Sequence, residues 1–163
     1  MTETTEQTIN NFIAFSKEVA KRIVEGDGEE HDPILFFLKD GTHAFAPVLD
    51  GMHPAHVLEI ILKKMNPDAY VIITEAWAWA SLVEESDPRT DKILNGDLHV
   101  SDLPLAERKE ILVISSCVKG QRARMSIADI VTVANARMVQ PWRDIDDSKD
   151  GEGVSGRLAV KEW

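Results

Sequence analysis

The stretch VIITEAWAWASL, residues 71–82, alternates large and small side chains and decides the expected fold. In an extended strand, Glu75, Trp77 and Trp79 fall on one face, and the other face carries Thr74, Ala76, Ala78 and Ala80. Neither face is polar enough for a sheet with one wet side. We therefore predict a central strand that is covered on both faces, with a helix packed closely on the alanine face.

The tryptophan face has two interpretations. It could be core, covered by the first helix, with Phe12 and Phe15 near the indole rings. It could also be a surface for self-association or for a protein partner, because exposed paired tryptophans mark interfaces. Glu75 favours the second interpretation, since a lone carboxylate is rarely buried. The candidate interface residues are Trp77, Trp79 and Glu75.

Around this strand, hydrophobic spacing and turn signals predict the remaining elements. Asp-Gly before Thr42 is typical of a hairpin turn, Pro54 suits a first helical position with His53 as its cap, and Asn66-Pro67 ends that helix. The expected helices span 6–25 and 54–65, and the expected strands span 34–38, 43–48, 69–83, 109–118 and 122–127.

The stretch ADIVTVANARMV, residues 128–139, fits both a helical and a strand pattern, and its β-branched residues favour a strand. The resulting order is α-β-β-α-β-β-β, in which hairpins dominate. This order predicts an α+β fold with a mostly antiparallel five-stranded sheet and helices packed on its faces.

From Glu6 to Ala134, the helix, hairpin, second helix and three-stranded meander resemble the roadblock and longin class of profilin-like domains. The resemblance lies in the architecture and implies an α+β fold, with no named activity. The segments TEAW and LPLAERKEILVI are also similar to uncharacterised prokaryotic and phage proteins.

Length and composition are typical of one globular domain. The chain has 163 residues, 44% of them hydrophobic and 28% charged. We expect a single domain over 1–163, with its core at about 6–134, an acidic insert at 84–106 and a loop-rich tail at 140–163. No apolar run could span a membrane, and the single cysteine, Cys117, fits a reducing compartment. The expected location is the cytoplasm.

The net charge of -10 disfavours generic nucleic-acid binding, because an acidic surface repels phosphate backbones. Lys119, Arg122 and Arg124 nevertheless gather around one hairpin as a basic patch, which could bind RNA or an acidic protein surface. Since no aromatic residue for base stacking lies in this hairpin, nucleic acid is the less favoured partner.

No sequence motif points to catalysis. The chain lacks a Walker loop, a Gly-x-Ser-x-Gly elbow, a Cys-x-x-Cys pair and a dinucleotide fingerprint, so we assign no catalytic residue and expect no cofactor. His53 and His56 could join His43 in a metal site, although a capping His53 and an exposed His56 are favoured. Residues 146–157 resemble a calcium loop in part, but Arg157 stands where a glutamate ligand is needed, which favours an acidic surface loop.

These patterns together predict a non-enzymatic protein-interaction or scaffold domain that associates with itself, as a homodimer or a subunit of a larger assembly. One alternative is a metal-dependent hydrolase that uses the histidines. Another is an RNA-associated factor that uses the basic patch.

Overall fold

A computed structural model of the chain describes residues 6–27, 33–48, 51–79, 88–99, 102–145, 154–155 and 163. Within these ranges, no helix combines the length and the hydropathy that a membrane crossing requires. The helices are α1 (Glu6–Asp27), α2 (Pro54–Met65), α3 (Pro88–Leu94) and the 3-10 turn η2 (Leu105–Glu107). The strands are β1 (Ile34–Lys39), β2 (Thr42–Pro47), β3 (Ala69–Trp79), β4 (Arg108–Val118), β5 (Arg124–Val133), β6 (Ala136–Val139), β7 (Arg143–Ile145) and β8 (Val154–Ser155).

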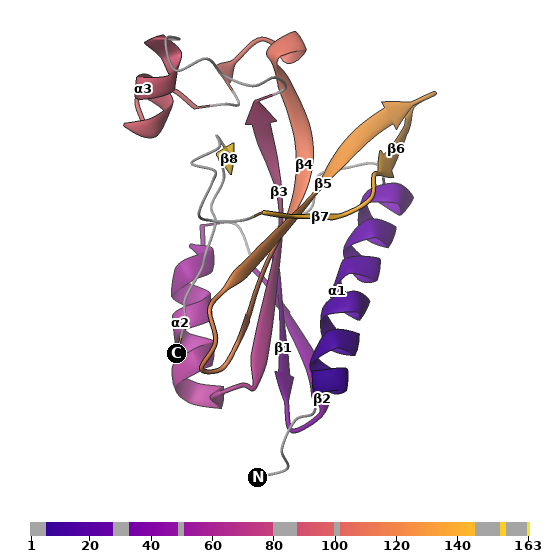
Figure 1. Ribbon diagram of the computed structural model, residues 1–163, viewed down its shortest axis with the longest axis vertical. Coiled ribbons are helices and arrows are strands. Elements are labelled where there is room, and N and C mark those ends of the chain that lie inside the picture. Colours follow the sequence, from indigo (N-terminus) through magenta and orange to yellow (C-terminus); the bar gives the residue numbers. More distant parts are fainter. Residues whose placement is uncertain are drawn as a thin grey trace.

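The strands form one curled sheet in the order β2-β1-β3-β4-β5-β6, and β7 and β8 pair with β5 and β3 (Figure 1). Every pairing between described strands is antiparallel, as predicted. The expected count of five strands is wrong. The ambiguous stretch is indeed extended, but it turns at Ala134 and Asn135, which both have positive φ, and so makes two strands where one was expected.

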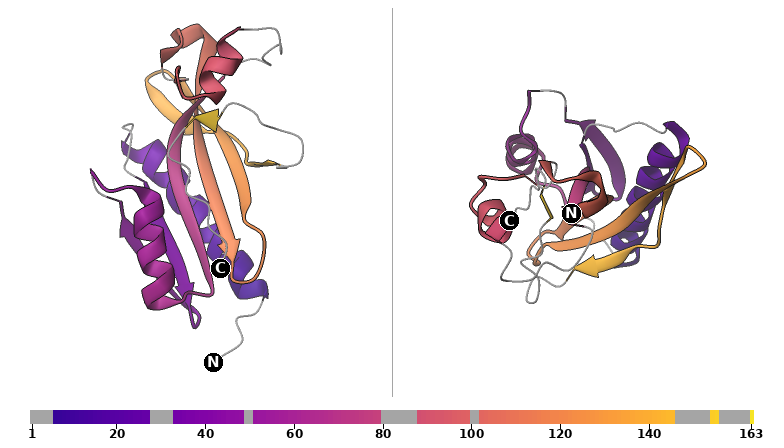
Figure 2. Two further views of the ribbon diagram at one scale, coloured as in Figure 1. Left: turned by 90° about the vertical axis from the view of Figure 1, so that its left-hand side faces the viewer. Right: turned by 90° about the horizontal axis from the view of Figure 1, so that it is seen from above.

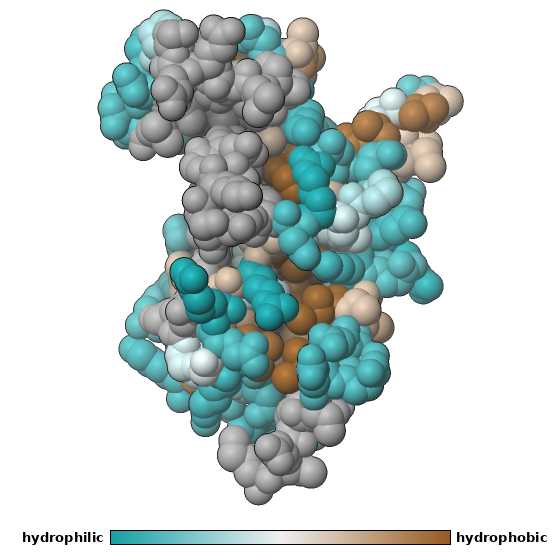
Figure 3. All heavy atoms as spheres, viewed as in Figure 1, coloured by the Kyte–Doolittle hydropathy of each residue, from teal (hydrophilic) through white to brown (hydrophobic). Residues whose placement is uncertain are grey.

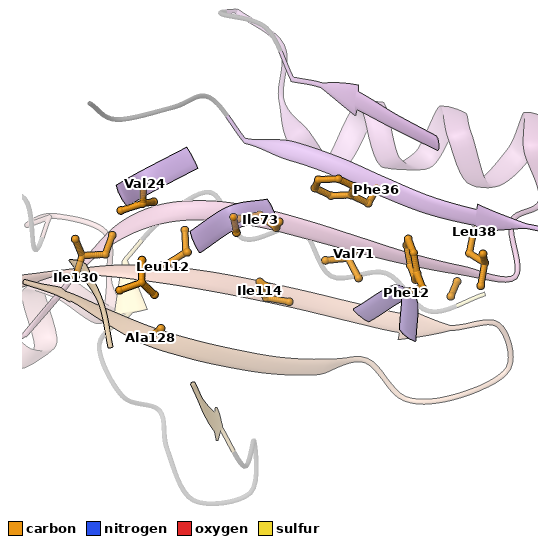
Figure 4. Packing of buried hydrophobic residues seen from close by; sticks show 13 residues of the cluster. Phe12, Val24, Phe36, Leu38, Val71, Ile73, Leu112, Ile114, Ala128 and Ile130 are labelled. Atoms are coloured by element: carbon orange, nitrogen blue, oxygen red, sulfur yellow. The ribbon is translucent and has the colours of Figure 1, made fainter. Parts of the chain in front are cut away.

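Helix α1 lies inside the curl of the sheet (Figures 1 and 2). Its buried side chains Phe12, Ala20 and Val24 pack against one face of the central strands. Figure 4 shows that Val24 lies near Leu112 and Ile130 at one end of this core, while Phe12 lies at the other end. This is the face of β3 that also carries Trp77 and Trp79, so the expected cover of the tryptophan face by the first helix is confirmed along part of β3.

Helix α2 packs on the opposite face (Figure 2). Its N-terminus follows the prediction: Pro54 is the first helical residue, and His53 Nδ1 accepts a hydrogen bond of 3.2 Å from Ala55 N. The buried side of α2 meets Tyr70 and Ile72 of β3.

The alanine face is not covered by α2, contrary to expectation. Ala76 and Ala78 belong to a separate buried cluster with Ile111, Val113 and Ile127, and none of the described members of this cluster lies in a helix. The helix has only 12 residues and lies against the first half of the long strand β3.

The acidic insert is more structured than the sequence predicts. Its described part contains α3 and η2, and Arg89 Nη1 lies 2.6 Å from Glu107 Oε2, which links the two. A long connection in a compact domain often carries secondary structure of its own.

Candidate interaction surfaces

A buried ion cluster lies on the α1 side of the sheet, beyond the end of the helix-covered core. Glu75 of β3 and Glu110 of β4 are diagonal neighbours on one face of the sheet, because Glu75 pairs with Leu112 and Trp77 pairs with Glu110. Arg137 of β6 reaches both carboxylates through Nη2, at 3.1 Å from Glu75 Oε2 and 3.3 Å from Glu110 Oε2. The Arg137 and Glu75 side chains are only 9% and 8% exposed.

The electrostatics of this cluster favour a charged arginine. Burial by itself lowers the pKa of Arg137, but the hydrogen bond with Glu75 and the charges of Glu75 and Glu110 outweigh it, so the pKa is raised above its usual value. The guanidinium thus holds two carboxylates and fastens β6 to the central strands.

The three predicted interface residues have different surroundings. The side chain of Glu75 is almost buried, so the expectation of a partly exposed carboxylate is wrong, and its paired charge explains why. The ring of Trp77 is half-buried, with the guanidinium carbon of Arg108 at 4.2 Å from its centroid. The backbone of Trp79 is in β3, but its side chain lies outside the described part. Phe12 and Phe15 pack against His43, and among the described side chains no ring contact joins either of them to Trp77.

The free edge of β2 carries an exposed aromatic patch that was not predicted. We call this edge, with the side chains of His43, Phe45 and the neighbouring Phe15, the β2 edge. Phe45 of β2 is 70% exposed and Phe15 of α1 is 49% exposed, and His43 of β2, two residues before Phe45, contacts Phe15. The centroid of the His43 ring lies 5.5 Å from that of Phe15, and the ring of Phe45 lies 6.2 Å from Phe36. Strand β2 is the last strand at its side of the described sheet.

A second apolar patch covers the outer face of the β5–β6 hairpin. Val131 pairs with Met138, and Val133 pairs with Ala136, so these four side chains share one face, and all four are exposed. Figure 3 shows apolar side chains at the free end of this projecting hairpin.

The basic patch lies in and beside the β4–β5 turn, where Lys119, Arg122 and Arg124 are all exposed. The structure adds a contact that the sequence does not show: Lys119 Nζ donates to Asn66 Oδ1 at 2.7 Å, while Lys39 Nζ donates to Asn66 O at 2.9 Å. This end of the molecule is therefore more basic than the hairpin alone.

The three histidines do not share a site. His43 packs between Phe12 and Phe15 on the α1 side, and His53 caps α2, as predicted, with His56 exposed in the following turn. Among the described residues, no group of three or more His, Cys, Asp or Glu side chains could hold a metal ion. The partial calcium loop at 146–157 lies almost entirely outside the described ranges.

Sequence reasoning missed Arg137 and Phe45. An inward Glu75 is a signal that a cation must lie nearby, but the cation is 62 residues away, and its position depends on the unexpected β5–β6 hairpin. The segment THAFAP carries no charge, which is a signal for an unprotected edge, but only the strand order shows that β2 is an edge.

No protein-family model matches the chain, and searches of curated proteins and of solved structures found no significant match either. The resemblance to roadblock and longin domains therefore stays a prediction. The function has to be argued from the surfaces described above.

Proposed function

We propose that the chain is a non-enzymatic protein-interaction domain that associates with itself through the β2 edge. The supporting observation is Phe45, which is 70% exposed on an edge strand, two residues from His43, whose ring contacts the half-exposed Phe15. Exposed aromatic side chains next to an unpaired strand edge favour association with another strand.

The geometry of the β1–β2 hairpin gives the edge its pairing capacity. Asp40 and Gly41 both have positive φ, and Lys39 pairs with Thr42, which defines a two-residue turn of type I′. In such a hairpin, Thr42 directs its backbone groups towards β1. By alternation, His43 and Phe45 direct their N–H and C=O groups away from β1, towards the free edge.

A second copy fits this edge by two-fold symmetry. If two β2 strands run antiparallel with Ala44 on the axis, His43 of each copy lies opposite Phe45 of the other. Both residues present their backbone groups to the edge, so each of these pairs can form two hydrogen bonds. The side chains of His43 and Phe45 would meet across the axis on the α1 side, next to Phe15.

Charge also favours this edge. Two copies with a net charge of -10 repel each other, but residues 42–48, THAFAPV, contain no Asp, Glu, Lys or Arg. Contact at the β2 edge thus avoids placing like charges opposite each other. The proposed interface moves from the tryptophan face to this edge because Glu75 is committed to Arg137 and Arg108 covers Trp77.

The test is sedimentation equilibrium of the native chain and three Glu variants. We expect a native dimer, and we expect Phe45→Glu to dissociate it, since an interface aromatic contributes roughly 2–4 kcal/mol, or about 30- to 1000-fold in association. Ile60→Glu, which places the same charge on a 39% exposed residue of α2, should leave the dimer intact. Val133→Glu tests the other apolar patch.

Two results would contradict the proposal. One is a native chain that sediments as a monomer at micromolar concentration. The other is dissociation by Val133→Glu but not by Phe45→Glu, which would assign the interface to the β5–β6 hairpin.

A further inference from the structure

One end of the molecule gathers cations that form no ion pair with a carboxylate of the described residues. They come from the β1–β2 turn, the last turn of α2, and the β4–β5 turn, which lie together at the lower end of the molecule in Figure 1. We call this surface the basic end, and its residues are Lys39, Lys64, Lys119, Arg122 and Arg124. None of them forms an ion pair within the part of the chain that the structure describes.

Most cations elsewhere are neutralised, which makes the basic end unusual. The paired ones contact carboxylates within 4.0 Å, and they are Lys21, Arg22, Lys63, Arg89, Lys109, Arg137 and Arg143. Lys17 and Arg108 lie over the rings of Trp142 and Trp77. The chain has 28 acidic and 18 basic residues, and Asp40 and Asp68 are described acidic residues that make hydrogen bonds at the basic end.

Hydrogen bonds hold the basic end in shape. Asn66, the C-cap of α2, accepts from Lys39 Nζ at its backbone oxygen and from Lys119 Nζ at its side chain. Asp68 joins the same three segments, because its carboxylate accepts from Asp40 N at 2.8 Å and its backbone oxygen accepts from Lys119 N at 2.9 Å. The cations therefore sit on a preorganised platform, which lowers the entropy that binding has to overcome.

Lys39 and Lys119 have a structural explanation, but the other three cations of the basic end do not. Lys39 and Lys119 stabilise the C-terminal end of α2, where backbone carbonyls are unsatisfied. Lys64, Arg122 and Arg124 are exposed and have no such contact among the described residues. Their charge is available to a partner.

We infer that the basic end binds a carboxylate-rich protein segment. Arginine presents a planar fork that matches a carboxylate, and the two exposed arginines lie two residues apart. A nucleic acid is a poorer match, because its backbone carries a charge every few ångströms and would extend from the basic end over the acidic body. The nearby ring of Trp163 is half-buried and packs on Tyr70, with centroids 5.4 Å apart, so it is poorly placed to stack on a base.

The test is fluorescence anisotropy of a labelled oligoglutamate peptide with the full chain. We expect salt-sensitive binding that is roughly tenfold weaker in the double variant Arg122→Glu/Arg124→Glu. The matched control is Arg22→Glu/Lys92→Glu, which changes the net charge equally at exposed positions of α1 and α3 and should bind like the native chain. A single-stranded oligonucleotide of equal charge should bind more weakly than the peptide.

Three results would overturn the inference. Equal weakening by the control variant would show a general charge effect. Tighter binding of the oligonucleotide would assign the surface to nucleic acid. Loss of the native oligomer in the Arg122→Glu/Arg124→Glu variant would make a second copy of the chain the occupant.

Discussion

Arg137 shows how one side chain can determine where a strand lies. A buried ion pair repays its desolvation only when its geometry is good and further hydrogen bonds complete it. Arg137 meets this condition with two carboxylates on two different strands, at 3.1 and 3.3 Å. Its main effect is to fix the register of β6, since a shift of one residue would turn the arginine to the outer face and leave Glu75 buried without this cation.

Replacing Arg137 by methionine should therefore be strongly destabilising. Methionine keeps much of the apolar stem but removes this cation from Glu75, whose side chain is 8% exposed. Breaking a buried ion pair in this way typically costs about 3–5 kcal/mol. Urea unfolding measures the loss. Arg143→Met is the matched control, because Arg143 is 48% exposed and its pair with Asp129 is worth less than about 1 kcal/mol. Equal losses in the two variants would refute a special role for the buried cluster.

The pH dependence of that loss has a definite sign. A cation whose pKa is raised on folding contributes stability at every pH below its ordinary pKa, and that stability is lost only as the pH rises through the raised value. The cost of Arg137→Met should therefore stay constant between about pH 7 and about pH 10, where the arginine remains charged.

At the scale of elements, the sequence is most informative where a local signal decides the structure. The Asp-Gly turn, Pro54 and the Asn66-Pro67 end all depend on the backbone preferences of one or two residues, and all three appear as predicted. The β5–β6 hairpin was harder to predict, because its turn is Ala134-Asn135 and alanine is not typical of positive φ.

The capping histidine gives a direct test of one such local signal. His53→Ala removes the acceptor for Ala55 N and should lower the free energy of unfolding by about 1 kcal/mol. His56→Ala, one turn later and exposed, should change it little. Chemical denaturation of both variants makes the comparison. A larger loss in His56→Ala would mean that the second histidine has a role that the structure does not explain.

At the scale of the whole molecule, the candidate sites depend on contacts between residues far apart in sequence. Glu75 meets Arg137, and Asn66 meets both Lys39 and Lys119, 27 and 53 residues away. Periodicity predicts which face of a strand a side chain occupies, but the strand order decides which faces meet and which strands are edges. The hydrophobic pattern of β2 is the same for an edge and an interior strand, so the β2 edge could not be deduced from sequence alone.

Self-association through the β2 edge should couple assembly to stability. If only the folded chain dimerises, mass action raises the apparent free energy of unfolding by about 1.4 kcal per mole of dimer for each tenfold increase in chain concentration. The thermal midpoint of the native chain and of Ile60→Glu should thus rise with concentration, while that of Phe45→Glu should not. Because Phe45 is 70% exposed, its replacement removes little core packing, so at high dilution the native chain and Phe45→Glu should melt within a few degrees of each other. Midpoints of the native chain that do not change across this concentration range would show that the exposed β2 edge is not a dimer interface.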